Sequence, residues 1–82
     1  MTQKDKRIER LRANASGVRF AVLAAVLCDH GFEQRGGKGS HVVFKHPGAV
    51  VSLAIPDPGR GYVDPVYVRQ ALRAIGEAHG RG

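Results

Sequence analysis

The chain of 82 residues has room for one domain and leaves little room for a second. Hydrophobic residues make up 43% of it, which excludes outright disorder. Its 13 Lys and Arg residues exceed its 7 Asp and Glu residues, so the net charge is +6 at neutral pH. A charge of this sign favours an anionic partner: nucleic acid first, then an acidic protein or a membrane surface. The alternative is that the basic surface only keeps a small protein soluble.

Cysteine usage and hydropathy favour a soluble protein of the cytoplasm. Cys28 is the one cysteine, so no internal disulfide can form, as is usual in a reducing compartment. The first residues are charged and no apolar run follows them, so we expect no signal peptide. The longest apolar run, from Phe20 to Cys28, is broken at Asp29 and is too short to span a bilayer. We therefore expect no membrane contact.

The N-terminal segment predicts a basic helical arm. Basic residues outnumber acidic ones in residues 1–12, and only Ile8 and Leu11 offer an apolar edge. Because two apolar residues hold a helix weakly, we expect this arm to fray. It is interpreted either as a solvated tail or as a segment that grips phosphates or covers a partner.

The next segment, residues 17–30, has the apolar spacing of a helix. We expect Ser16 to be its N-cap and Gly31 to end it in a left-handed conformation. Cys28 is expected to be a buried or half-buried filler, and His30 to interact with the helix dipole. The predicted core stripe consists of Phe20, Leu23, Ala24 and Leu27, with Val22 and Val26 on a neighbouring flank.

Three strands and a second helix follow. The expected strands are residues 32–35, 40–46 and 50–55, which form an antiparallel meander. The third strand is apolar at nearly every position, so we expect one face to meet the helices and the other to contact a partner or a second copy. Asp64 and Pro65 predict the start of the last helix, as N-cap and first helical residue. Its predicted buried stripe is Val68, Ala71, Leu72 and Ile75, with Arg69 and Arg73 exposed.

The order of these elements predicts an α+β fold: a two-layer domain of helix, three-stranded antiparallel sheet and helix, with both helices on one sheet face. Double-stranded RNA-binding domains share this arrangement, although fold alone does not give function. We expect three parts, namely a basic N-terminal arm at residues 1–15, the α-β-β-β-α domain at residues 16–77, and a frayed tail at residues 78–82.

The stretch GGKGSHVVFKHP, residues 36–47, carries the candidate site. Its glycines can take positive φ and let the backbone approach a ligand closely. Side chains alternate along a strand, so His41 and Lys45 should share a face, with Lys38 and Ser40 close by. An imidazole, a hydroxyl and two ammonium groups around such a turn suit a phosphodiester ligand.

Four short motifs resemble the HicA toxins of bacterial HicAB toxin–antitoxin systems. These are GF at the start of the first strand, KGSH, FKHP, and VRQAL in the last helix, at residues 31–32, 38–41, 44–47 and 68–72. The resemblance covers roughly residues 18–76. It implies a double-stranded-RNA-binding-like fold, ribosome-independent cleavage of mRNA by an endoribonuclease, and neutralisation by a HicB-like antitoxin. The functional histidine of the family's GSH motif corresponds to His41.

The chain departs from the usual family pattern at two places. Gly36 and Gly37 put two residues between the first-strand arginine and KGSH, where the family has one. The loop PDPGRG after the third strand has Arg60 as its only cation, where the family carries a histidine or a lysine-rich stretch. These departures concern the grip on RNA more than the fold.

RNA cleavage by attack of the 2′-OH on the adjacent phosphate needs a base, an acid and cations. His41 is the histidine placed to act as the base. The acid is not identified, since alternation puts His46 on the opposite face, where we expect a turn residue. Neither histidine has a nearby cysteine or carboxylate cluster, so we expect no metal and no cofactor. The residues expected to bind RNA or phosphate are Arg35, Lys38, Gly39, Ser40, Lys45 and Arg60.

Two other functions stay open at this point. One is an RNA-binding module without catalysis, in which His41 is only a contact. The other is a protein-interaction subunit whose basic face docks an acidic partner. A homodimer and a toxin–antitoxin hetero-oligomer are both compatible with the sequence, and the preferred cleavage sequence is not indicated.

Overall fold

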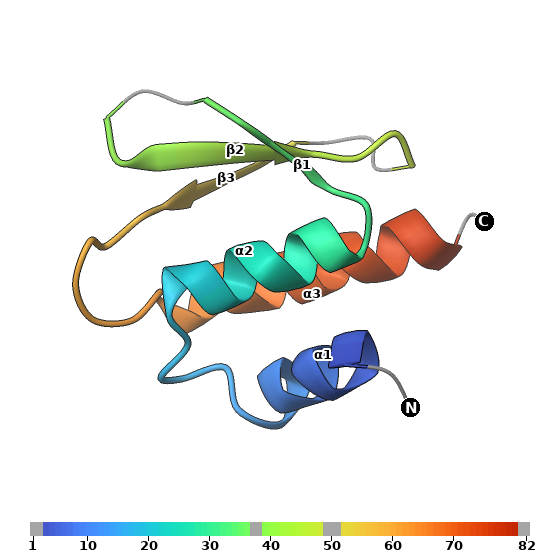
Figure 1. The fold of residues 1–82 in the computed structure, drawn as a ribbon, viewed down its shortest axis with the longest axis horizontal. Coiled ribbons are helices and arrows are strands. Elements are labelled where there is room, and N and C mark those ends of the chain that lie inside the picture. The colour runs from blue at the N-terminus through green and yellow to red at the C-terminus, as the bar shows by residue number, and fades with distance from the viewer. Residues whose placement is uncertain (1–2, 37–38, 49–51, 81–82) are drawn as a thin grey trace.

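The computed structural model describes residues 3–36, 39–48 and 52–80. In chain order its elements are α1 (Gln3–Ala13), α2 (Phe20–Asp29), β1 (Glu33–Arg35), β2 (His41–Lys45), β3 (Leu53–Pro56) and α3 (Pro65–Gly80). Figure 1 shows α2 and α3 packed beneath one face of the sheet, with α1 beneath the two helices. The predicted α+β fold is confirmed.

The three strands form an antiparallel meander in the order β1-β2-β3, as predicted. The central strand pairs through Phe44 with Gln34 of β1 and with Leu53 of β3. Each strand is shorter than predicted. The start of the predicted third strand, residues 50–51, lies outside the described residues.

The core lies between the sheet and the two helices beneath it. Alternation along β2 turns Phe44 toward the helices, where it is fully buried, and Ile55 of β3 is fully buried on the same side. The helices contribute an apolar stripe each. Their buried residues are Leu23, Val26 and Leu27 of α2, and Val68, Ala71, Ala74, Ile75 and Ala78 of α3.

The start of α2 differs from the prediction. The N-cap is Arg19, and the Ser16 backbone N–H donates instead to Asn14 Oδ1 at 3.0 Å. Gly17 has φ of +71°, in the left-handed region, so the chain turns sharply before the helix begins. The segment after this turn is extended, and the Val18 carbonyl accepts a hydrogen bond from the Val63 N–H at 2.7 Å. This tether, together with the turn, delays the helix to Phe20.

The end of α2 confirms the prediction for Gly31. This residue has φ of +89° and its N–H donates to the Cys28 carbonyl, while the Phe32 N–H donates to the Leu27 carbonyl. The pair of bonds is a Schellman motif, and the two buried side chains of Leu27 and Phe32 provide its hydrophobic contact. Since Phe32 completes the cap, β1 begins one residue later than predicted. Cys28 is exposed, so its prediction as a filler is wrong.

The start of α3 is the one the sequence predicts. Asp64 Oδ1 accepts a hydrogen bond from the Val66 N–H at 3.0 Å, and Pro65 is the first helical residue. The helix continues to Gly80 and Ala78 is buried, so the expectation of a frayed tail from residue 78 is wrong for residues 78–80. Residues 81–82 lie outside the described residues.

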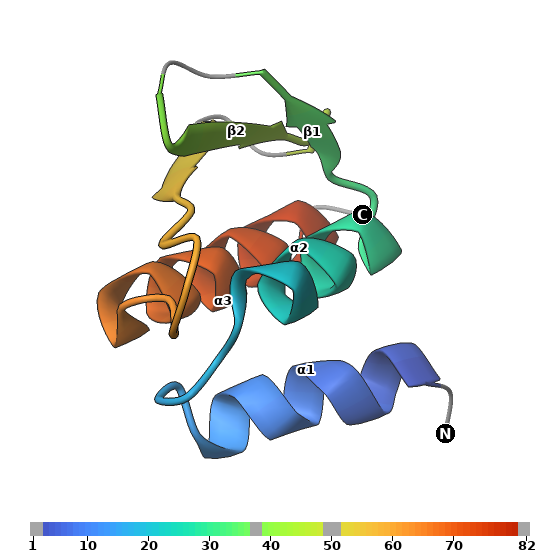
Figure 2. The ribbon, with the colours of Figure 1, turned by 60° about the vertical axis from the view of Figure 1, so that its left-hand side comes forward.

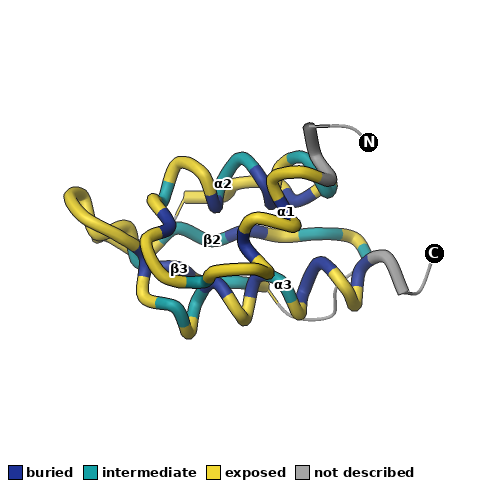
Figure 3. Tube along the Cα trace, turned by 90° about the horizontal axis from the view of Figure 1, so that it is seen from below, coloured by how far each residue is buried: buried dark blue, intermediate teal, exposed yellow. Residues whose placement is uncertain are grey.

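The N-terminal segment is a packed helix, which corrects the expectation of a frayed arm. Ile8 and Leu11 are both buried in the same core cluster as α2 and α3. Arg7 adds an ion pair to Asp29 of α2, at 2.6 Å between Nη1 and Oδ2. Figure 2 shows α1 as a third layer on the side of α2 and α3 away from the sheet, and Figure 3 shows buried positions in all three helices. The division into an arm, a domain and a tail stays a prediction.

Candidate functional site

His41 is the first residue of β2, and its side chain is exposed. It lies opposite Pro56, the last residue of β3. Because Phe44 points toward the helices, alternation directs His41, Val43 and Lys45 to the face of the sheet that no helix covers. The imidazole is therefore presented to solvent at one end of an uncovered face.

Backbone contacts fix the chain on both sides of His41. Gly39 has φ of +63°, so the left-handed conformation expected of this glycine turn is present there. The Asp57 N–H donates to the Ser40 carbonyl at 2.7 Å, which extends the pairing of β2 and β3 by one bond. The Asp57 carboxylate turns back to accept from the Gly59 N–H at 2.9 Å. These bonds tie the loop after β3 to the residue that precedes the imidazole.

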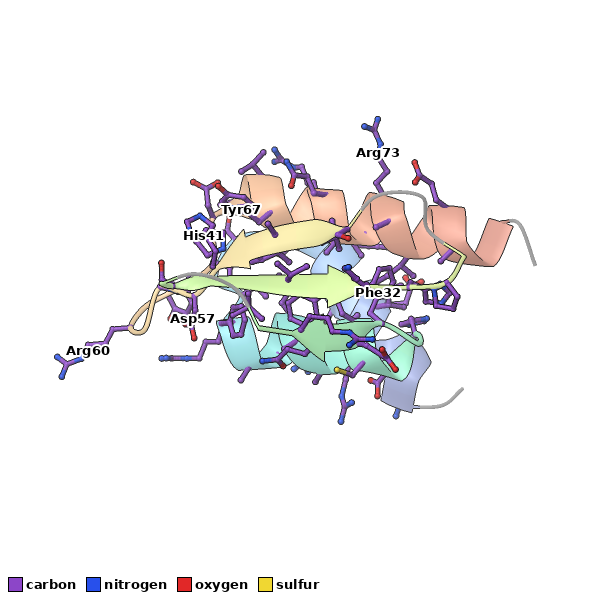
Figure 4. All side chains as sticks on the ribbon, turned by 90° about the horizontal axis from the view of Figure 1, so that it is seen from above. Phe32, His41, Asp57, Arg60, Tyr67 and Arg73 are labelled. Carbon is purple, nitrogen blue, oxygen red and sulfur yellow. The ribbon has the colours of Figure 1, made fainter. Side chains whose placement is uncertain are left out.

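The cations predicted around His41 are spread over the sheet. Lys45 shares the face of His41, but it lies four residues away, which at about 3.4 Å per residue is about 14 Å along the strand. Arg35 pairs with Glu33 at 2.8 Å on the exposed surface of β1. Figure 4 shows Arg60 extended away from the sheet beyond His41. The backbones of His41 and Lys45 are therefore separated by the length of β2.

The structure tests neither Lys38 nor Ser40 as a phosphate contact. Lys38 and the neighbouring Gly37 lie outside the described residues. Ser40 is exposed beside His41, and its carbonyl is used by Asp57. Its hydroxyl stays a predicted phosphate contact.

Sequence reasoning missed Tyr67. This residue lies in the first turn of α3, and its half-buried side chain packs against the core cluster. Figure 4 shows it at the same end of the sheet as His41 and Asp57. Tyr67 lies four and seven residues before the buried Ala71 and Ala74, so helical spacing places it at the N-terminal end of the buried stripe of α3, and this spacing is the sequence signal that could have found it.

His46 lies at the other end of β2 and does not join His41. Its ring contacts that of Phe32, and its Nδ1 accepts a hydrogen bond from the Gly48 N–H at 2.7 Å. The interpretation of His46 as a turn residue agrees with this bond. Within residues 3–36, 39–48 and 52–80, no group of three or more His, Cys, Asp or Glu side chains is arranged to hold a metal ion. In the same ranges, no helix has the length and hydropathy needed to cross a membrane.

One comparison with known proteins identifies the family. A family model for the HicA toxin of bacterial toxin–antitoxin systems matches residues 22–77, well over half of the chain. The match begins within α2 and ends within α3, so it includes the sheet and His41, while α1 precedes it. Comparisons with curated proteins and with solved structures give no match. The chain therefore belongs to the HicA toxin family, and its role is that of the toxin whose partner is an antitoxin.

Proposed function

We propose that this toxin is an endoribonuclease that cleaves mRNA, with His41 as its catalytic residue. The observation that carries the proposal is the position of His41: an exposed imidazole at the end of an uncovered sheet face, within the residues that match the family. The net charge of +6 supports a polyanionic substrate.

The proposed reaction is internal transesterification. His41 takes the proton of a ribose 2′-OH, whose oxygen attacks the adjacent phosphorus while the bond to the 5′ oxygen breaks. The products are a 2′,3′-cyclic phosphate and a free 5′-OH. Ser40, Lys38 and the backbone around Gly39 would stabilise the negative charge on the phosphate during this step.

The leaving 5′ oxygen needs a proton, and Tyr67 is our choice for the donor. Its body is held against the core and its position is at the same end of the sheet as His41. Tyrosine is one of the side chains that act as general acids. Arg35 pairs with Val43, two residues from His41 on the same face, and would contact the same phosphate or the next one, while Lys45 and Arg60 would contact neighbouring phosphates.

The setting of this activity is also a proposal. RNA cleavage of this kind needs access to mRNA, which places the toxin in the cytoplasm. The antitoxin would neutralise it by covering the uncovered sheet face and His41. A toxin–antitoxin hetero-oligomer would provide such cover, whereas a homodimer of the active toxin would leave His41 exposed.

The test is controlled expression in a bacterial host of the wild type, of His41→Ala and, as a matched control, of Arg73→Ala on α3. We expect growth arrest and loss of intact mRNA for the wild type and Arg73→Ala, and neither for His41→Ala. Purified proteins should cleave RNA in the same order, with the cyclic phosphate detected at the new end. If His41→Ala cleaves RNA as fast as the wild type does, the imidazole takes no part in the reaction. RNA binding without cleavage by the folded wild type would identify a binding module instead.

A further inference from the structure

Three neighbouring hollows follow one side of the protein from α1 to the loop after β3. The first, of about 270 Å³, is lined by Lys6, Arg7, Arg10 and Val22. The second, of about 430 Å³, shares Arg10 and Val22 with the first and includes Arg19 and Tyr62. The third, of about 260 Å³, shares Arg19 with the second and reaches Asp57 and Gly59. Because each hollow shares lining residues with the next, they lie in series along the surface, and we call this series the basic groove.

The basic groove ends beside the candidate catalytic residue. Asp57 lines its last hollow, and the Asp57 N–H is bonded to the carbonyl of Ser40, the residue before His41. Figure 2 shows the loop before α3 descending from the end of the sheet toward the start of α2 and the segment that follows α1. A linear ligand at His41 could therefore continue along the groove without leaving the surface.

The charge of the groove fits a polyanion. Among the described residues, Lys6, Arg10 and Arg19 line it without a carboxylate in ion-pair distance. Asp57 is the acidic residue among those that line the hollows, and it accepts a bond from the Gly59 N–H, while Arg7 of the first hollow pairs with Asp29. Positive charge is in excess along the first two hollows, which attracts a phosphate backbone, while the Asp57 carboxylate offsets Arg19 in the third.

An aromatic platform lies at the middle of the groove. The Tyr62 side chain is 57% exposed, and the guanidinium carbon of Arg19 lies 5.3 Å from its ring centroid. Val22 lines the same hollow and is also exposed, so the two side chains present an apolar surface there. Aromatic rings and arginine planes are the surfaces on which the bases of single-stranded RNA stack. Cations along the path and a stacking platform at its centre favour RNA over an acidic protein segment.

We propose that the basic groove binds single-stranded RNA that continues from the phosphate at His41, with Arg10 and Arg19 contacting phosphates and Tyr62 stacking on a base. This inference rests on the proposed function, because it extends the substrate of the same site. It gives α1, which precedes the family match, a direct part in holding the substrate.

The test measures binding rather than cleavage. The probe is 2′-O-methyl RNA of about 12 nucleotides, within the usual range of single-strand site sizes. It lacks the attacking hydroxyl and so stays intact on the wild type. The variants are Arg10→Gln/Arg19→Gln and Tyr62→Ala. The matched control is Arg69→Gln/Arg73→Gln, which removes the same charge from exposed positions on α3. Thermal unfolding of each protein checks that the fold is kept.

For Arg10→Gln/Arg19→Gln we expect the slope of log affinity against log salt to fall by about 1.4, at about 0.7 for each lost phosphate contact. The affinity at 0.1 M salt should drop about 25-fold, which is that slope over one decade of salt concentration. Tyr62→Ala should weaken binding about 10-fold with an unchanged slope, because stacking is not ionic. The control should bind as the wild type does.

Equal affinity and slope in the groove variants and the control would overturn the inference. So would variants that keep RNA affinity and lose the antitoxin, since the groove would then be a protein-docking surface. The two proposals fail separately. If the wild type binds the probe through the groove and cleaves no RNA, the catalytic proposal is wrong and the proposal of an RNA-binding groove stands. If the wild type cleaves RNA and the groove variants bind the probe as the wild type does, only the proposal of an RNA-binding groove is wrong.

Discussion

The ring of His46 packs against the ring of Phe32, with their centroids 4.9 Å apart and their planes inclined by 50°. Phe32 completes the cap of α2, and His46 Nδ1 accepts the hydrogen bond from Gly48 in the turn after β2. The contact therefore joins the α2–β1 junction to the β2–β3 turn. His41 is the first residue of β2 and His46 follows its last residue, so the two imidazoles lie at opposite ends of the strand.

His46→Ala should destabilise the fold by about 1–2 kcal/mol, through loss of one hydrogen bond and one ring contact. The measurement is urea unfolding followed by circular dichroism. His41→Ala is the matched control, since its exposed side chain should change stability by no more than about 0.5 kcal/mol. Equal stability of the two variants would show that the His46 contacts do not contribute.

Gly31→Ala should destabilise the fold by about 1–3 kcal/mol. The residue has φ of +89°, and an added Cβ would lie 2.9 Å from His46 Nε2, so the substitution strains the backbone and displaces the ring. Gly36→Ala is the control, because φ there is not positive and a Cβ would meet nothing within 4 Å. Similar unfolding midpoints for both variants would contradict this account of the helix end.

Leu11→Ala should cost about 2–4 kcal/mol if α1 unfolds together with the domain, since the side chain is only 2% exposed. Arg12→Ala, exposed on the same helix, should change stability by less than about 0.5 kcal/mol. Chemical denaturation followed by circular dichroism measures both. A loss of helix signal at unchanged midpoint would mean instead that α1 detaches alone.

Tyr67→Phe should reduce the cleavage rate about 100-fold or more, the usual range for loss of a general acid. The substitution keeps the aromatic body that packs on the core, so the unfolding midpoint should stay close to that of the wild type. Single-turnover cleavage of a defined RNA measures the rate, with His41→Ala as the lower limit. A wild-type rate in Tyr67→Phe would assign the proton to another group or to water.

The sequence predicts the elements whose signals are local. Asp64 and Pro65 mark the start of α3, and Gly31 marks the end of α2, because caps depend on a few adjacent residues. Ser16 is an equally good local signal for the N-cap of α2, but the N-cap is Arg19. The tether between Val18 and Val63 comes from a distant part of the chain, so no local pattern could show it.

The candidate site shows the same division. Alternation in β2 correctly places His41 on the face opposite Phe44, which is a local property. The bond from Asp57 to Ser40 and the position of Tyr67 depend on how the sheet and α3 meet, and so required the structure. The same holds for α1: two apolar residues are a weak signal, yet Ile8 and Leu11 are buried because α2 and α3 together offer them a surface.

The attachment of α1 has a consequence for hydrogen exchange. The helix is held through Ile8, Leu11 and one ion pair, so its amides should exchange through local opening, at lower protection than those of α2 and α3. RNA that spans the groove would contact α1 and α2 together, and binding to the closed state alone would raise the protection of α1. RNA binding and the docking of α1 would then be coupled, and the exchange rate of each α1 amide would report both.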